Sequence, residues 1–311
     1  DEAMNLRIRS MNVGRLLFLT NAMNRFILTL VQRALFACLV LYVHTAAASG
    51  SVVLNVGTYN LRFDTPEDGI NAWPNRSEAV KALVRYHELD VFGTQEGLAH
   101  QLADLESMGA YARVGVGRDD GKSAGEHSAI FYRKSRFRPL RNGDFWLSET
   151  PDRPSMGWDA KCCNRIASWV ELRDVYSGAS FFVFSVHFDH EGVIARRESA
   201  KLLIERIKTI AGDRPVICVG DFNTTPETEP IVTMRSLLRD AYEISIAPPY
   251  GSVGTFNGFR FGEPVTNRID YIFVSPNIKV LRYAALTDSL DRRYPSDHFP
   301  VIARVSVPLL E

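Results

Sequence analysis

Apolar residues recur along the chain in two distinct patterns. Around residues 79–87 and 200–210 they return at helical spacing, which predicts one amphipathic helix at each place. Strand-like runs are more numerous, and they cover residues 52–60, 90–95, 128–133, 165–172, 180–188, 214–222, 268–275, 279–286 and 301–307. Several runs are apolar on both faces, so we expect these strands to be covered on both sides. Many buried strands with few helices between them predict a layered α/β domain with packed sheets inside and helices outside.

The composition is that of a folded protein with no overall charge. The chain is 46% hydrophobic and 23% charged, which excludes a disordered, collagen-like or disulfide-dense small fold. Lys plus Arg and Asp plus Glu are both 36, so the overall field does not favour a strongly basic nucleic-acid binder. No repeat or linker interrupts residues 52–308, which predicts one domain.

The N-terminal segment has the order of a secretory leader. Arg25 and Arg33 precede an apolar run over residues 34–43, and three alanines at 46–48 offer a cleavage site. We therefore expect a signal peptide at 23–48, a mature domain at 49–311, and a secreted, periplasmic or extracellular location. The apolar run is shorter than the about 20 residues that span a bilayer, so a membrane anchor is less favoured and no stable membrane insertion is expected after cleavage.

Two further questions stay open at this stage. Met4, Met11 and Met23 are alternative starts, so residues 1–22 can stem from an over-long gene model. We expect the cysteines of the mature chain to be buried or free thiols, because adjacent cysteines rarely bridge each other. A bridge from Cys162 or Cys163 to Cys218 remains open.

Polar residues stand where the buried strands end. They are Asn60, Glu96, His187, Asp189, His190, Asp221, Asn223, Asp270, Asp297 and His298. Residues two apart share one face of an extended chain, which pairs Asp221 with Asn223. A carboxylate at a buried strand end is costly unless it is paired or bound to a metal. Oxygen ligands without cysteine indicate Mg²⁺, with Mn²⁺ as the alternative.

Six of these motifs together resemble one known superfamily. TYN, QE, VHFDH, GDFN, RIDYIF and SDH, in this order over about residues 52–308, are similar to the endonuclease/exonuclease/phosphatase superfamily, to which deoxyribonuclease I belongs. The spellings RIDYIFVS and SDHFPV are most similar to members related to carbon-catabolite-repressor-type deadenylases. The resemblance implies a four-layered α/β sandwich, with two packed mixed β-sheets flanked by helices.

The resemblance also implies a metal site. Glu96 matches the principal Mg²⁺ ligand of the family, and Asn60 and Asp297 are expected close to the same ion. For Asn60 the competing interpretation is a simple turn cap.

The catalytic residues implied by the resemblance are His187, Asp221, Asn223, Asp270 and His298. His187 is expected to contact phosphate, while Asp221 and Asn223 orient the water and hold a phosphate oxygen. Asp270 is expected to accept a hydrogen bond from His298, so that His298 activates the attacking water. Whether Asp221 shares the role of the base stays open.

Further candidates for substrate binding have weaker support. They are Arg76, Tyr132, Arg165, Asp189, His190, Arg196 and Asn257. The arginines can clamp a phosphate with two hydrogen bonds, although most arginines are solvated surface residues.

These residues together predict a secreted, Mg²⁺-dependent hydrolase of phosphoesters, a phosphodiesterase or a phosphatase, acting as a monomer. A secreted nuclease acting on single-stranded nucleic acid is the leading specific form. The alternatives are a phospholipase C or sphingomyelinase-type enzyme, against which the lack of a long apolar hairpin weighs, and a non-catalytic binding module. The substrate stays open among DNA, RNA, lipid headgroups and inositol or sugar phosphates.

Overall fold

The computed structural model describes residues 50–309, so the expected signal peptide at 23–48 and residues 1–22 lie outside the described part. Two mixed sheets form its centre. The first has the strand order β10-β12-β13-β1-β2-β4-β3. Its strands are β1 (Ser51–Asn60), β2 (Val91–Gln95), β3 (Tyr111–Val114), β4 (Ile130–Arg133), β10 (Tyr250–Gly251), β12 (Lys279–Ala285) and β13 (Val301–Pro308).

The second sheet has the order β5-β6-β7-β8-β11-β9. Its strands are β5 (Phe137–Trp146), β6 (Ile166–Asp174), β7 (Ser180–His187), β8 (Val216–Asp221), β9 (Arg239–Asp240) and β11 (Asp270–Val274). The helices of the domain are η1 (Pro66–Asn71), η2 (Trp73–Asn75), α2 (Ser77–Tyr86), α3 (Ala99–Glu106), α4 (Val193–Ala211), α5 (Glu229–Arg235) and α6 (Ala241–Ile244).

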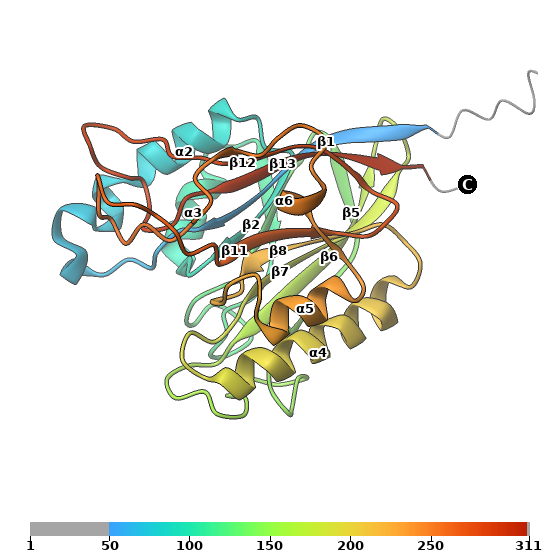
Figure 1. The fold of residues 1–311 in the computed structure, drawn as a ribbon, viewed down its shortest axis with the longest axis horizontal. Coiled ribbons are helices and arrows are strands. Elements are labelled where there is room, and N and C mark those ends of the chain that lie inside the picture. The colour runs from blue at the N-terminus through green and yellow to red at the C-terminus, as the bar shows by residue number, and fades with distance from the viewer. Residues whose placement is uncertain (1–49, 310–311) are drawn as a thin grey trace, which may run out of the picture. The chain divides into compact units, whose positions relative to one another are not determined.

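Three apolar cores separate four layers. Between the sheets, Leu54 of β1 packs in one core with Ile217 of β8 and Ile272 of β11. On the outer face of the second sheet, α4 and α5 cover a second core, and α2 and α3 cover a third core on the first sheet. Figure 1 shows α2 and α3 on one side of the paired sheets and α4 and α5 on the other. The expected α/β sandwich is confirmed.

Gly93 of β2 lets the two sheets pack closely near Glu96. A Cβ there would lie 2.5 Å from Val219 Cγ2 and 2.7 Å from Ser185 Oγ, both on the facing sheet. Two residues further along β2, Gln95 Nε2 donates a hydrogen bond to Ser185 Oγ at 3.2 Å. The sheets are therefore tied together one residue before Glu96.

The elements that the sequence pattern missed are short, except for β5, which is largely exposed. Both expected helices and each expected strand are present, but β3, β5, β9, β10, α3, α5, α6 and the short helices η1 and η2 were not predicted. β5 is an edge strand that pairs only with β6, and its residues 138–142 are exposed, so the pattern there is polar. Within residues 50–309, no helix combines the length and the apolar character needed to cross a membrane.

One expectation about the cysteines was wrong. Cys162 and Cys163 form a disulfide with each other, and Cys218 is buried in β8 as a free thiol. Cys218 is buried in the core under α4, whereas Cys162 is exposed at the surface, so the two do not form a bridge.

Candidate active site

Strand register brings three of the predicted residues into one row. In the parallel pair β7–β8, His187 lies opposite Asp221, and in the antiparallel pair β8–β11, Asp221 lies opposite Asp270. On the facing sheet, Asn60 ends β1 opposite Gln95 of β2, and Glu96 follows directly. The ends of two sheets therefore present one acidic cluster.

Asn60 joins the two sheets at this cluster. Its side-chain nitrogen donates to Glu96 Oε1 at 2.9 Å and to Asp221 Oδ2 at 3.1 Å, and the residue is fully buried. Because the amide nitrogen faces both carboxylates, Asn60 acts here as a hydrogen-bond donor that positions them, and its oxygen accepts from the Arg62 backbone N–H.

Two site residues depart from ordinary backbone conformation. Glu96 has φ 62° and Asn223 has φ 49°, both in the left-handed region. Asparagine tolerates this region, but glutamate rarely occupies it. Such strain at the end of a buried strand is typical of a functional position, because the surrounding structure must hold it in place. Glu96 is fixed further by the Phe63 N–H, which donates to Oε2 at 3.1 Å.

His298 is surrounded by carboxylates. Its Nδ1 lies 2.8 Å from Asp270 Oδ2, and its Nε2 lies 3.8 Å from Asp221 Oδ2. Burial alone would lower the pKa of His298, but the charges of Asp270 and Asp221 outweigh it and raise the pKa well above the ordinary value. Burial, with the nearby Asp270 carboxylate, raises the pKa of Asp221 to about 7.

The charged group closest to His187 is an arginine, and two carboxylates lie slightly further away, Asp221 at 3.6 Å and Glu126 at 3.8 Å. Arg165 Nη1 lies 3.1 Å from both ring nitrogens, and Asn223 Nδ2 lies 3.1 Å from Nε2. Burial and the positive charge of Arg165 hold the pKa of His187 well below its ordinary value. One histidine is thus kept protonated and the other neutral at the same site.

These residues line a pocket of about 400 Å³. One end, which we call the acidic end, consists of Glu96, Asp221, Asn223, Asp297 and His298. The other, the arginine end, consists of Arg118, Glu126, Cys163, Arg165 and His190. His187 lines the pocket as well, with Arg165 on one side and Asp221 Oδ2 at 3.6 Å on the other.

Sequence reasoning missed part of the arginine end. Arg118 and Glu126 lie on the loop between β3 and β4, and Arg118 Nη1 donates to Glu126 Oε2 at 2.6 Å. His127 forms isolated β-bridges with Gly97 and with Gly117, so this loop folds back onto the segment after Glu96. Burial raises the pKa of Glu126 to about 7. The only signal in the sequence was a glycine-rich stretch at 115–125, which has no periodicity.

Arg165 and His190, two of the candidates for substrate binding, line the pocket. Arg165 Nη2 donates to His190 Nδ1 at 2.7 Å, and Arg165 Nε lies 3.4 Å from Asp189 Oδ2. Asp189 itself is buried and does not line the pocket, because its other oxygen accepts from the N–H groups of Glu191 and Gly192. It therefore positions Arg165 and the start of α4.

The remaining candidates are not among the residues that line this pocket. Arg76 is buried, and its guanidinium donates to the backbone oxygens of Asn71, Leu61, Arg62 and Pro295. Tyr132 packs in the core between the sheets. Arg196 donates to the Asp189 carbonyl at 3.0 Å, and Asn257 donates to the Ser296 carbonyl at 3.1 Å. Arg76 and Asn257 thus brace the segment that carries Asp297 and His298.

The acidic end fits a divalent cation. Oxygen and nitrogen atoms of Glu96, His187 and Asp221 lie within 4.8 Å of one another. Burial raises the pKa of Asp297, and the charge of Glu96 adds to this rise while that of His298 opposes it. The oxygen donors of the acidic end match Mg²⁺ or Mn²⁺.

Comparison with known proteins identifies the class. The sequence profile described as "Endonuclease/Exonuclease/phosphatase family" matches residues 57–298. The chain belongs to this family and is an enzyme of the phosphoester-hydrolase class, as the motifs predicted.

Two similar solved structures come from Bacteroides thetaiotaomicron. One is a protein of the same family, 43% identical with a TM-score of 0.79, covering 84% of this chain and 100% of that one. The other is a mannosyl-6-phosphatase, 43% identical with a TM-score of 0.77, covering 81% of this chain and 99% of that one.

Curated relatives include nocturnin of Drosophila melanogaster, 30% identical over 56% of this chain and 31% of its own length. The chain spans between 30% and 66% of the length of the curated relatives that it matches.

Proposed function

We propose that this protein is a metal-dependent phosphatase that hydrolyses a phosphate monoester of a sugar. The observation that carries the proposal is the pocket itself, in which an acidic end suited to a cation adjoins an arginine end suited to a polar leaving group. The mannosyl-6-phosphatase that is 43% identical over nearly its whole length supports the monoester and the sugar.

Glu96 and Asp297 would hold the cation, which we propose to be Mg²⁺. When bound, it supplies positive charge that offsets the charge on the phosphate and leaving oxygens. Asn60 keeps Glu96 and Asp221 in place by donating to both.

The two histidines and Asp221 then have separate tasks. A carboxylate with a pKa of about 7 is well matched to accept a proton from water at neutral pH, so Asp221 is the base. His298, held by Asp270, carries a proton and donates a hydrogen bond to a phosphate oxygen. Neutral His187 and the Asn223 amide contact the other oxygens. The water oxygen bonds to phosphorus, its proton goes to Asp221, and the departing alcohol takes a proton from solvent.

The assay compares two classes of substrate. The purified mature chain is incubated in Mg²⁺ with hexose 6-phosphates and, separately, with a fluorescent single-stranded oligonucleotide. Release of inorganic phosphate from the sugar esters without cleavage of the oligonucleotide is the expected result. Cleavage of the oligonucleotide alone would overturn the phosphatase and return the enzyme to the nuclease that the sequence favoured.

We also propose that the mature chain is secreted and acts as a monomer. The Cys162–Cys163 disulfide supports export, because disulfides persist in oxidising compartments. N-terminal sequencing of the protein from the culture medium should begin at Ser49, and light scattering should give the mass of one chain. A protein that stays in the cytosol with residues 23–48 attached would contradict the proposed export.

A further inference from the structure

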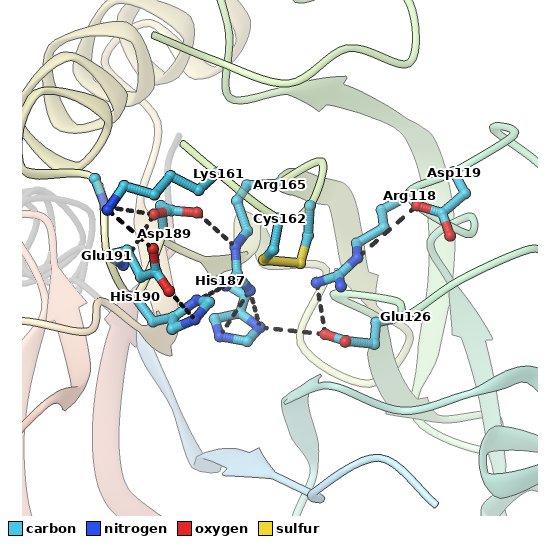
Figure 2. Close-up of a disulfide and its surroundings, with 12 residues drawn as sticks. Arg118, Asp119, Glu126, Lys161, Cys162, Arg165, His187, Asp189, His190 and Glu191 are labelled. Carbon is cyan, nitrogen blue, oxygen red and sulfur yellow. Dashed lines mark hydrogen bonds and ion pairs between the residues drawn. A yellow bond between two sulfur atoms is a disulfide. The ribbon is translucent and has the colours of Figure 1, made fainter. Parts of the chain in front are cut away.

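The disulfide between Cys162 and Cys163 lies on the wall of the active-site pocket. Cys163 lines the arginine end together with Arg118 and Arg165. Cys162 is exposed and Cys163 is half-buried, so the bridge faces solvent and the pocket. In Figure 2 it is drawn between Arg165 on one side and the pair Arg118–Glu126 on the other, with His187 beneath.

The bridge is apolar, whereas the residues named at the arginine end beside it are charged or polar. A disulfide offers no N–H or O–H donor, so its surface is suited to contact with C–H groups. Around it stand the guanidinium groups of Arg118 and Arg165, the Glu126 carboxylate and the His190 ring. This combination matches a pyranose ring, in which C–H groups form a face and hydroxyl groups point outward from the edge.

The Arg118 guanidinium at this end is held by two carboxylates. Arg118 is nine-tenths buried, and its Nε forms an ion pair with Asp119 Oδ1 at 4.0 Å. Its Nη1 is held by Glu126 at 2.6 Å, which fixes the direction of the guanidinium. Because this guanidinium lines the pocket and carries only donors, a hydroxyl or ring oxygen of the substrate is the matching group.

A hydrogen bond also connects the loop of the disulfide with the loop of Arg118. Asn164 Nδ2, next to Cys163, donates to the Arg118 carbonyl at 3.2 Å. Closing a ring between adjacent residues restricts the backbone of both, so the bridge keeps its surface at a fixed place beside Arg118. Arg165, two residues after Cys163, holds His187 at the acidic end.

We infer that the Cys162–Cys163 disulfide, with Arg118 and Glu126, is the binding site for the sugar ring of the leaving group. The disulfide contacts the apolar face of the ring, while Arg118 and Glu126 contact its oxygens. The inference rests on the proposed phosphatase function, because the acidic end must hold the phosphate of the same molecule.

The first experiment establishes the bridge in solution. Denatured mature protein is alkylated with iodoacetamide before and after reduction, and the products are identified by mass spectrometry. Cys218 alone should react before reduction, and Cys162 and Cys163 should react after it. Alkylation of all three without reduction would overturn the inference.

The second experiment compares two esters of one chemistry. Hexose 6-phosphate carries the ring, whereas methyl phosphate offers the same phosphoryl group on a small primary alcohol. In the double variant Cys162→Ser, Cys163→Ser, the kcat/KM for the sugar ester should fall about ten-fold more than the kcat/KM for methyl phosphate. The fall should come from a higher KM for the sugar ester. A lost apolar contact between enzyme and substrate reduces discrimination by about this factor. Equal losses for both esters would indicate a structural role alone and overturn the inference.

Two controls separate this inference from the proposed function. Met156→Ser makes an apolar-to-polar change on the same loop, at an exposed residue that does not line the pocket, and should leave the ratio unchanged. If the wild type hydrolyses neither ester, the phosphatase proposal fails, and the binding of hexose 6-phosphate is then measured by calorimetry. Equal affinity in the wild type and the double variant would overturn the sugar site independently.

Discussion

The two ends of the pocket are built in different ways. At the acidic end, Asp221 and Asp270 stand on hydrogen-bonded strands, so their separation is set by sheet register. At the arginine end, Arg118, Glu126 and Cys163 stand on loops held by a few side-chain contacts. Reactions need groups held to within about 0.5 Å, which strands provide, whereas loops can change without disturbing the sheets. The comparison indicates chemistry at the first end and selection of the leaving group at the second.

The two ends also differ in the groups that they present. The acidic end gathers buried carboxylates, and Asp270 Oδ1 has no hydrogen-bond partner within residues 50–309. The arginine end presents the guanidinium groups of Arg118 and Arg165 instead. Each end is therefore completed by a ligand of the opposite character, a cation at one and the oxygens of a sugar at the other.

Removing divalent cations should have the largest effect. With EDTA, phosphate release should stop, and excess Mg²⁺ should restore it, because the carboxylates of Glu96 and Asp297 then regain their counter-charge. Mg²⁺ should also raise the melting temperature, since saturation to 100 times Kd contributes about 2.7 kcal/mol. A phosphate-release assay checks the activity, and scanning calorimetry checks the melting temperature. In a Glu96→Gln variant, Mg²⁺ should no longer raise the melting temperature. Full activity in EDTA would remove the metal from the acidic end.

Asp221→Asn should come next. The amide keeps the size of the side chain but cannot accept a proton, so kcat should fall by about 10² to 10⁴-fold. Circular dichroism should show an unchanged fold. Asp152→Asn, on a side chain that is 83% exposed, serves as the control and should keep its activity. A kcat within a few-fold of wild type would assign the base to another group.

Arg165→Lys tests the link between the two ends. Arg165 contacts His187, His190 and Asp189 through three different nitrogens, a geometry that an ammonium group does not reproduce. We expect kcat/KM to fall about ten-fold, since displacing a charge-assisted hydrogen bond costs about 1.5 kcal/mol or more. Lys161→Arg, on an exposed neighbour of the disulfide, should have little effect. If Arg165→Lys were neutral in steady-state assays, the two ends would act independently.

Glu126→Gln should have the smallest effect, and it should depend on pH. Burial raises the pKa of Glu126 from 4.5 to about 7 in the folded protein. The protonated carboxyl thus contributes stability that is complete below about pH 4.5 and lost as the pH rises through 7. Relative to Glu126→Gln, the free energy of unfolding of the wild type should decline across this window, as measured by urea denaturation in EDTA. Glu78→Gln, on an exposed side chain, is the control and should run parallel to the wild type.

Part of the acidic end could be predicted because its residues follow buried strands. The apolar runs before Asn60, Glu96, His187 and Asp221 mark strand ends, and a strand end fixes which sheet edge its last residue reaches. Arg76 shows the limit of this reasoning. Its type suggested a phosphate clamp, but the fold surrounds its guanidinium with backbone oxygens.

By itself, the sequence determined most of the strands, the family and the acidic residues, because periodicity and motif order are local properties that one chain displays directly. Only the tertiary structure decided the arginine end. Arg118, Glu126 and Cys163 come from two loops far apart in the chain, and no period or spacing relates them. The packing of those loops against the sheet ends brings the three together, and the Cys162–Cys163 bridge depends on a backbone geometry that residue types do not specify.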